Sequence, residues 1–109
     1  MNAGDQFPHV CSAPCIGVFD SGVGGLSVLV ALRERLPRAP LHYVADSAFA
    51  PYGERSRAEV VDRSMRIVQR LLQQNAALVV VACNTATALT IDALRERWPQ
   101  VPFVGVEPG

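Results

Sequence analysis

The chain has 109 residues, half of them apolar, which is enough for the core of one modest domain but not of two. Ten acidic residues balance ten basic ones, so the charge pattern indicates neither a nucleic-acid partner nor an anionic membrane surface. All ten basic residues are arginines. The chain therefore lacks the lysine on which a pyridoxal phosphate enzyme or a P-loop nucleotide hydrolase depends.

The first 14 residues predict a disordered tail, and residues 15–109 predict one domain. The tail lacks the basic start and apolar centre of a secretory signal. The longest apolar run covers residues 76–83, far short of the roughly 20 residues that span a bilayer. We therefore expect a cytoplasmic protein without a membrane partner.

Apolar runs bounded by turn-forming residues predict four strands, at residues 16–19, 41–45, 77–82 and 103–106. Helical spacing predicts a helix in each interval between them: from about residue 26 to Pro37, from Ser56 to about residue 75, and after Cys83 to Pro99. Ser56 followed by Glu59 is the signature of a capping box.

The apolar residues of the second and third helices recur at helical spacing, which predicts one buried face on each. In the second helix the expected face is Val61, Met65, Val68 and Leu72. In the third helix it is Ala88, Ile91, Leu94 and Trp98.

The order βαβαβαβ with short connections predicts an α/β fold, in which helices flank a parallel four-stranded sheet. Ligands of such sheets bind beyond the carboxyl ends of the strands. A cluster that contains polar residues follows every predicted strand at that position. The clusters are Asp20 and Ser21; Asp46 with the loop of Pro51, Tyr52 and Gly53; Cys83, Asn84 and Thr85; and Glu107. We therefore expect these residues to share one rim and to bind a small ligand.

Cys83 stands where the third strand meets the third helix. Backbone N–H groups and the positive end of the helix dipole stabilise a thiolate at such a junction, and the thiolate is the form that acts as nucleophile or base. A free cysteine can also be a packing residue. The polar Asn84 and Thr85 directly after the strand favour the functional interpretation, although one of them is expected to cap the helix.

The turn at residues 20–25, Asp-Ser-Gly-Val-Gly-Gly, is similar to the start of a dinucleotide fingerprint. Ser27 occupies the third glycine position, however, and Asp20 would place a carboxylate beside the pyrophosphate. We therefore expect no nucleotide cofactor. The glycines either let the backbone approach a small anionic ligand or form a tight turn.

The remaining candidates have structural interpretations. Cys11 and Cys15 lack the partner pattern of a tetrahedral metal site, so no metal is expected. Cys15 precedes the first strand and Asp20 follows it, so about five residues at roughly 3.3 Å each hold this thiol about 15 Å from the rim. Tyr52 could cover the edge of the core, Asp20 and Asp46 could be turn carboxylates, and His42 is expected to be a sheet residue.

Four segments together resemble glutamate racemase. They are DSGVGG at residues 20–25, ADSAFAPYGERS at residues 45–56, VVACNTATA at residues 80–88 and VGVEPG at residues 104–109. Their order within one α/β pattern makes the resemblance specific, and it extends from about residue 16 to the last residue.

The resemblance implies a cofactor-independent racemase that interconverts L- and D-glutamate for the synthesis of peptidoglycan precursors. It implies that Cys83 is one of two cysteines that exchange the α-proton and that Asp20 assists it. The substrate contacts that it implies are Asp20, Ser21, Pro51, Tyr52, Gly53, Asn84 and Thr85. A homodimer is expected of the full-length form, because members of this family are commonly dimeric.

Inverting Cα without a cofactor requires one group that removes the proton from one face and another that donates a proton to the opposite face. In the family the second cysteine lies in a second half, beyond the end of this sequence, so we interpret the chain as an N-terminal half. The alternatives are a non-catalytic binding module and a racemase of aspartate or another acidic amino acid. A sheet taken from a larger assembly is also expected to leave apolar surface uncovered.

Overall fold

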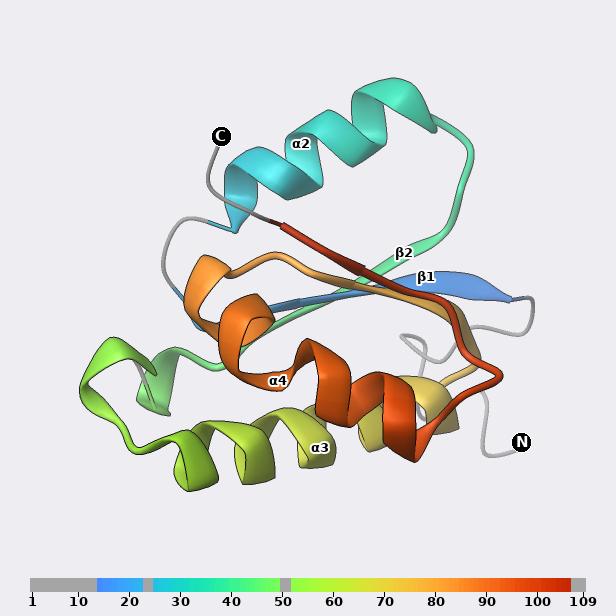
Figure 1. Cartoon of the computed structure of the whole chain (residues 1–109). Coiled ribbons are helices and arrows are strands. Elements are labelled where there is room, and N and C mark those ends of the chain that lie inside the picture. The colour runs from blue at the N-terminus through green and yellow to red at the C-terminus, as the bar shows by residue number, and fades with distance from the viewer. Residues whose placement is uncertain (1–13, 23–24, 50–51, 107–109) are drawn as a thin grey trace, which may run out of the picture.

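A parallel sheet with the strand order β2-β1-β3-β4 forms the centre of the molecule (Figure 1). The computed structural model describes residues 14–22, 25–49 and 52–106. The strands are β1 (Cys15–Asp20), β2 (Leu41–Ala45), β3 (Ala76–Val81) and β4 (Phe103–Gly105). The predicted four-stranded parallel sheet is confirmed, and all but Pro14 of the predicted tail lies outside the described residues.

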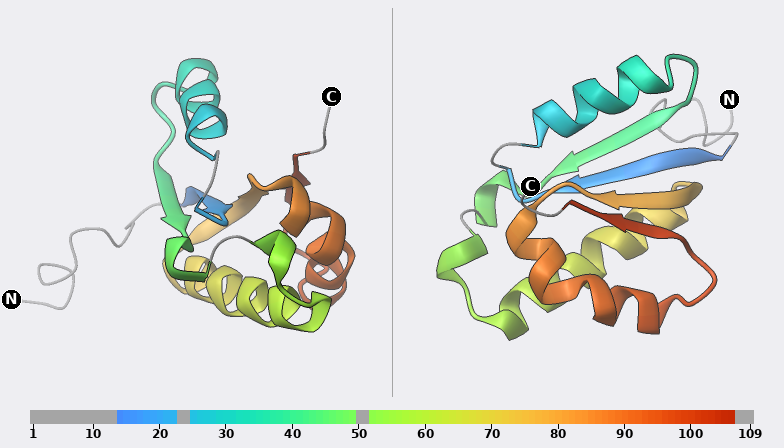
Figure 2. Two further views of the ribbon diagram at one scale, coloured as in Figure 1. Left: turned by 90° about the vertical axis from the view of Figure 1, so that its left-hand side faces the viewer. Right: turned by 45° about the horizontal axis from the view of Figure 1, so that its top comes forward.

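Three helices flank the sheet, as predicted. They are α2 (Leu26–Arg35), α3 (Arg57–Gln73) and α4 (Asn84–Arg97). Helix α2 lies on one face, and α3 and α4 lie together on the other (Figures 1 and 2). The capping box at the start of α3 is confirmed, because the Glu59 N–H donates to Ser56 Oγ and the Ser56 N–H donates to Glu59 Oε1, both at 3.1 Å. The predicted loop after β2 contains two short 3-10 helices, η1 (Ser47–Phe49) and η2 (Tyr52–Glu54).

Two apolar layers hold the helices to the sheet, because alternate side chains of a strand point to opposite faces. The larger layer joins Phe19, Val79 and Val81 to α3 and α4. The smaller layer joins Val18 and Val80 to α2. The central strands β1 and β3 are thus covered on both faces, which explains why their sequences show no polar alternation.

The buried faces of α3 and α4 differ from the predicted ones. In α3 the buried residues are Val60, Ser64, Val68 and Leu71, and the predicted Val61, Met65 and Leu72 lie half-buried beside them. In α4 they are Ala86, Thr87, Thr90 and Leu94, and Ala88 is exposed. The prediction for Ala88 was wrong because the threonine hydroxyls bond to backbone carbonyls, Thr90 to Ala86 and Thr87 to Val81, which allows both threonines to be buried.

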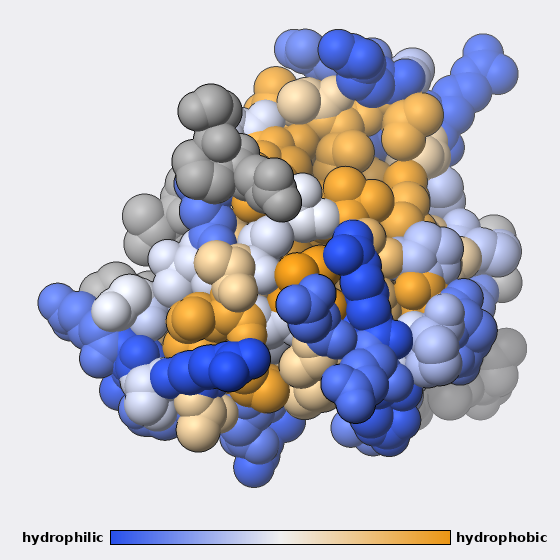
Figure 3. All heavy atoms as spheres, viewed as in Figure 1, coloured by the Kyte–Doolittle hydropathy of each residue, from blue (hydrophilic) through white to orange (hydrophobic). Residues whose placement is uncertain are grey.

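Helix α2 is attached to the sheet less completely than the other two, because none of its residues is buried. Leu26, Val30 and Leu36 are 64%, 54% and 43% exposed, and Val104 of β4 is 49% exposed. Figure 3 shows apolar side chains gathered between α2 and β4 on this face. The expected uncovered apolar surface is therefore present. Within the described residues, no helix has the length and apolar character needed to cross a membrane.

Candidate active site

The carboxyl ends of three strands bring the predicted polar residues to one rim. Beyond the regular strands, the Asp46 N–H donates to the Asp20 carbonyl at 2.9 Å, and the Ala82 N–H donates to the Phe19 carbonyl at 2.7 Å. These bonds hold the segments that follow β1, β2 and β3 side by side. The expected common rim is confirmed for the described residues.

A cavity of about 500 Å³ opens at this rim. It is lined by Ser21, Ser27, Val28, Tyr52, Gly53, Ala82, Cys83, Asn84, Thr85 and Val106. Six of the predicted site residues are in this set: Ser21, Tyr52, Gly53, Cys83, Asn84 and Thr85. The structure therefore brings most of the candidates around one space, while their roles toward a ligand stay predictions.

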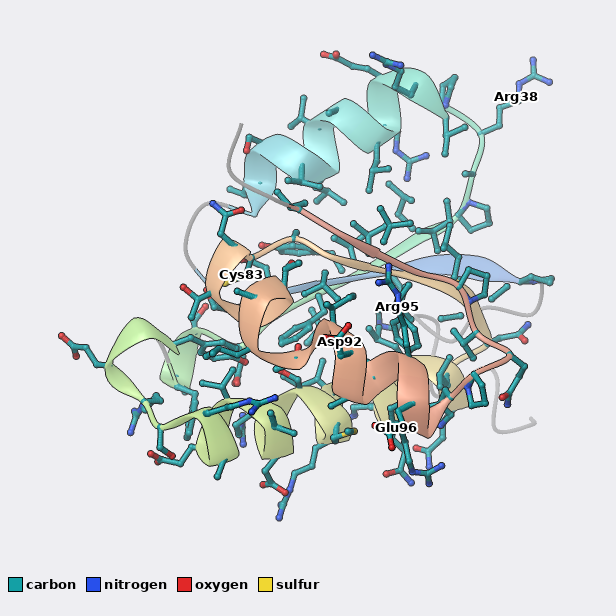
Figure 4. All side chains as sticks on the ribbon, in the orientation of Figure 1. Arg38, Cys83, Asp92, Arg95 and Glu96 are labelled. Atoms are coloured by element: carbon teal, nitrogen blue, oxygen red, sulfur yellow. The ribbon has the colours of Figure 1, made fainter. Side chains whose placement is uncertain are left out.

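Cys83 occupies the N-cap position of α4, with φ −132° and ψ 125°, and is half-buried (Figure 4). Its Sγ accepts a hydrogen bond from the Ala86 N–H at 3.5 Å. The expectation that Asn84 or Thr85 caps this helix was wrong, because the sulfur itself takes the cap. The sulfur thus lies where the N–H groups and dipole of a helix start favour negative charge.

Asp20 lies behind the wall of this cavity. Its side chain is buried, and its Oδ2 accepts hydrogen bonds from the Gly25 N–H and the Tyr43 hydroxyl, both at 3.1 Å. Its Oδ1 is buried and has no hydrogen-bond partner among the residues that the structure describes. Asp20 lines a second cavity, of about 490 Å³, and Ser27 lines both cavities. Asp20 and Cys83 therefore line different cavities, and Ser27 is a residue that the two cavities share.

The glycine-rich turn is shaped by this carboxylate. A Cβ on Gly25 would overlap the Asp20 carboxyl group, so only glycine allows this close approach. Gly22 has a φ of +105°, a conformation that favours glycine. The turn thus combines a positive φ with a close approach of backbone to a buried carboxylate. Burial, followed by the hydrogen bond to Asp20, raises the pKa of Tyr43 above its ordinary value.

Tyr52 forms part of the cavity wall and is fixed from behind by a buried carboxylate. Its hydroxyl donates to Asp46 Oδ2 at 2.7 Å. Burial, then the bond to Asp46, raises the pKa of Tyr52 well above its ordinary value. Burial alone would raise the pKa of Asp46, but the hydrogen bonds from Arg63 and Tyr52 hold that pKa below its ordinary value. Asp46 is therefore an anion that accepts, and Tyr52 a neutral donor, at neutral pH.

The sequence-based analysis did not assign four residues to the cavity or its support. Ser27 and Val106 line it, and Thr87 Oγ1 accepts from the Val106 N–H at 3.2 Å while donating to the Val81 carbonyl at 3.3 Å. Arg63 reaches the rim from α3 through Asp46. No local motif marks these residues. Some of their contacts join segments that are distant in the sequence, and a residue such as Ser27 has the pattern of an ordinary helix position.

Sequence comparison finds extensive similarity to glutamate racemases. The chain is 58% identical over 93 residues to the glutamate racemase of Pseudomonas aeruginosa, and 53% identical over 94 residues to that of Ralstonia pickettii. These matches cover 85% and 86% of this chain but 35% and 33% of the relatives. No model of a protein family matches the chain.

Structural comparison finds the same proteins. The glutamate racemase of Thermus thermophilus, solved with beta-chloro-D-alanine, matches with a TM-score of 0.79 and 48% identity, over 85% of this chain and 36% of that one. The Escherichia coli glutamate racemase, solved with L-glutamate and the activator UDP-MurNAc-ala, matches with a TM-score of 0.80 and 46% identity, over 86% and 35%. The resemblance to glutamate racemase is confirmed.

The chain spans about a third of the length of the glutamate racemases that it matches, which is consistent with its interpretation as their N-terminal part. Pro51, Glu107 and Cys11 lie outside the described residues. Cys15 begins β1, at the opposite end of that strand from Asp20, as expected. No group of three or more His, Cys, Asp or Glu side chains suited to a metal ion occurs among the residues that the structure describes.

Proposed function

We propose that this chain provides one face of a glutamate racemase active site, with Cys83 as the group that exchanges the α-proton. The observation that carries this proposal is the cavity at the rim. Its lining includes Cys83, the N-cap residue of α4, together with Ser21, Tyr52, Gly53, Asn84 and Thr85. Glutamate racemases with this fold have been solved with L-glutamate and with D-glutamate, which supports glutamate as the ligand.

In the proposed reaction the Cys83 thiolate removes the proton from Cα of glutamate and becomes a thiol. The electron pair left on Cα is shared with the substrate carboxylate, and an acid on the opposite face completes the inversion by donating a proton to Cα. The hydroxyl and amide groups of Ser21, Asn84 and Thr85 bind the substrate's polar groups in this proposal. Asp20, which is buried and does not line the cavity, assists the proton exchange of Cys83 in this proposal.

Only one thiol, that of Cys83, lines the cavity among the described residues. Racemisation at enzymatic rates therefore requires an opposing acid from another part of the polypeptide, and we propose that the part matching the rest of the relatives supplies it. A homodimer of the full-length form, located in the cytoplasm, is part of the same proposal. Sedimentation of the full-length protein tests the dimer.

The test is exchange of the glutamate α-proton in deuterated water, followed by proton NMR. We expect the chain to bind glutamate weakly and to exchange the α-proton slowly, and we expect Cys83→Ser to lose the exchange. Cys15→Ala is the matched control, because this thiol lies at the far end of β1. Exchange that survives in Cys83→Ser would contradict the assigned role of Cys83.

Racemisation is tested by joining residues 1–109 to the remaining part of the Pseudomonas aeruginosa relative and measuring D-glutamate by chiral chromatography. We expect turnover in the joined protein and none when it carries Cys83→Ser. Binding of glutamate without any exchange or turnover would favour the non-catalytic binding module. Faster exchange of aspartate than of glutamate would favour a racemase of the shorter acidic amino acid.

A further inference from the structure

Arg63 lies outside the cavity but is connected to its wall. It projects from α3, and its guanidinium pairs with both oxygens of Asp46, with Nε 3.0 Å from Oδ2 and Nη2 bonded to Oδ1. The Asp46 side chain is 6% exposed and that of Arg63 is 36% exposed. A planar fork of this kind fixes both the position and the orientation of a carboxylate.

The carboxylate that Arg63 orients is the one that holds Tyr52. Oδ2 of Asp46 accepts from the Tyr52 hydroxyl at 2.7 Å and from Arg63 Nε, while the Asp46 backbone is bonded to the end of β1. Three separate elements, α3, the end of β2 and η2, thus meet at one buried anion. Without Arg63 that anion would be buried with a single neutral donor, which is an unfavourable state.

The guanidinium also lies over the ring of Phe49, which packs against Tyr52. Arg63 Cζ lies 4.9 Å from the centre of the Phe49 ring, and Arg55 Cζ lies 4.2 Å from it. The Phe49 ring meets the Tyr52 ring edge to face at 6.0 Å, and the Phe19 ring lies 6.1 Å from Tyr52 on the core side. Arg63 therefore restrains Tyr52 both through hydrogen bonds and through stacking on Phe49.

We propose that Arg63 is a positioning residue for the substrate cavity, acting through Asp46 to hold the Tyr52–Gly53 part of the wall of the cavity that Cys83 also lines. This inference rests on the proposed function, because the ligand that the wall contacts is taken to be glutamate. It adds a residue that does not line the cavity. It explains why a charged side chain of α3, itself 36% exposed, pairs with a carboxylate that is almost fully buried.

The variants for the test are Arg63→Gln, which removes the charge, and Arg63→Lys, which keeps the charge but not the fork. Arg66→Gln is the matched control. Arg66 lies on the same helix, its side chain is 73% exposed, and it pairs with the surface residue Asp62. Tyr52→Phe removes the hydroxyl alone.

Two quantities are measured on each folded variant, the Kd for L-glutamate by NMR titration and the rate of alkylation of Cys83 by iodoacetamide. We expect Arg63→Gln to raise the Kd by about 10- to 100-fold and to speed alkylation severalfold, because a displaced wall costs binding and uncovers the sulfur. Arg63→Lys should give a partial effect, and Arg66→Gln none.

An unchanged Kd and an unchanged alkylation rate in Arg63→Gln would overturn the inference. If Arg63→Gln does not fold, a double-mutant cycle of Tyr52→Phe and Arg63→Lys replaces it. Non-additive effects on the Kd and the alkylation rate would support the inference that Arg63 acts through Tyr52, and additive effects would refute it. If the wild-type chain does not bind glutamate, the proposed function fails. The alkylation rates still decide whether Arg63 holds the wall, so the two failures are distinguishable.

Discussion

Replacing Gly25 with alanine should destabilise the fold strongly, because the new methyl group has no space. A Cβ at this position would overlap Cγ and Oδ2 of Asp20, and the Gly25 N–H donates to the same carboxylate. Either the carboxylate or the start of α2 must move. Both movements break the contact between the glycine-rich turn and the end of β1.

The expected size follows from the two losses. Overpacking a well-filled site costs about 1–3 kcal/mol, and losing a hydrogen bond to a buried charged group costs about 1.5–3 kcal/mol. The smaller entropy of the unfolded alanine chain offsets about 0.4–1 kcal/mol. We expect Gly25→Ala to lower the free energy of unfolding by about 1.5–5.5 kcal/mol, a large share of the roughly 5–15 kcal/mol typical of a domain.

Gly53→Ala is the matched control, because a Cβ on Gly53 would meet no atom of the described residues within 4 Å. Urea unfolding followed by circular dichroism and by the fluorescence of Trp98 measures both variants. Gly53→Ala should keep the wild-type stability or exceed it by about 0.4–1 kcal/mol. Since Gly53 lines the cavity, its variant should instead weaken glutamate binding. A Gly25→Ala protein that unfolds at the wild-type urea concentration would refute the reasoning.

Three further predictions concern charged and capping groups. The raised pKa values of Tyr43 and Tyr52 mean that their stabilising contribution is present below about pH 10 and lost as the pH rises through their folded-state values; ultraviolet titration at about pH 10 should therefore show less tyrosinate in the folded protein than in the unfolded protein. The lowered pKa of Asp46 means that its contribution is present above about pH 4 and lost as the pH falls further, so the urea midpoint should drop in acid and depend less on pH in Asp46→Asn. Ser56→Ala removes the hydroxyl that accepts a hydrogen bond from the Glu59 N–H, and it should lower the free energy of unfolding in urea by about 1 kcal/mol. An unchanged urea midpoint would show that the capping box does not stabilise α3.

The arrangement of elements was predictable because its signals are local. Apolar runs, Pro37 and Pro99 as breaks, and the Ser56–Glu59 pair each act within one or two turns of the chain. The observed strands accordingly start and end within one or two residues of the predicted ones. The parallel order then follows from the alternation of strands and helices.

The buried faces of the helices were less predictable, because apolar spacing ignores hydroxyl groups that are satisfied locally. Thr90 is buried because its Oγ1 donates to the Ala86 carbonyl one turn earlier. Ala88 carries an apolar side chain but points outward, and its small surface makes this exposure inexpensive. The predicted face of α4 therefore included Ala88 and omitted the threonines.

The rim was predictable from topology, whereas the contacts behind it were not. The carboxyl ends of parallel strands bring Ser21, Asp46 and Cys83 to one edge of the sheet, regardless of how their side chains pack. The pairing of Arg63 with Asp46 joins residues 17 positions apart, across a loop whose path the sequence does not define. From the sequence alone Asp46 is therefore an ordinary loop residue, because its partner Arg63 belongs to a helix whose position the sequence does not give.

Cys83 has two roles that can be separated by substitution, because it caps α4 and also faces the cavity. Serine is among the best N-cap residues and alanine among the poorest. Cys83→Ser should therefore keep or raise the urea midpoint while losing α-proton exchange, whereas Cys83→Ala should lose exchange and about 1 kcal/mol of stability. If both variants were as stable as the wild-type chain, the contact between Sγ and the Ala86 N–H would contribute nothing to the helix start. The position of the sulfur would then be explained by its chemistry alone.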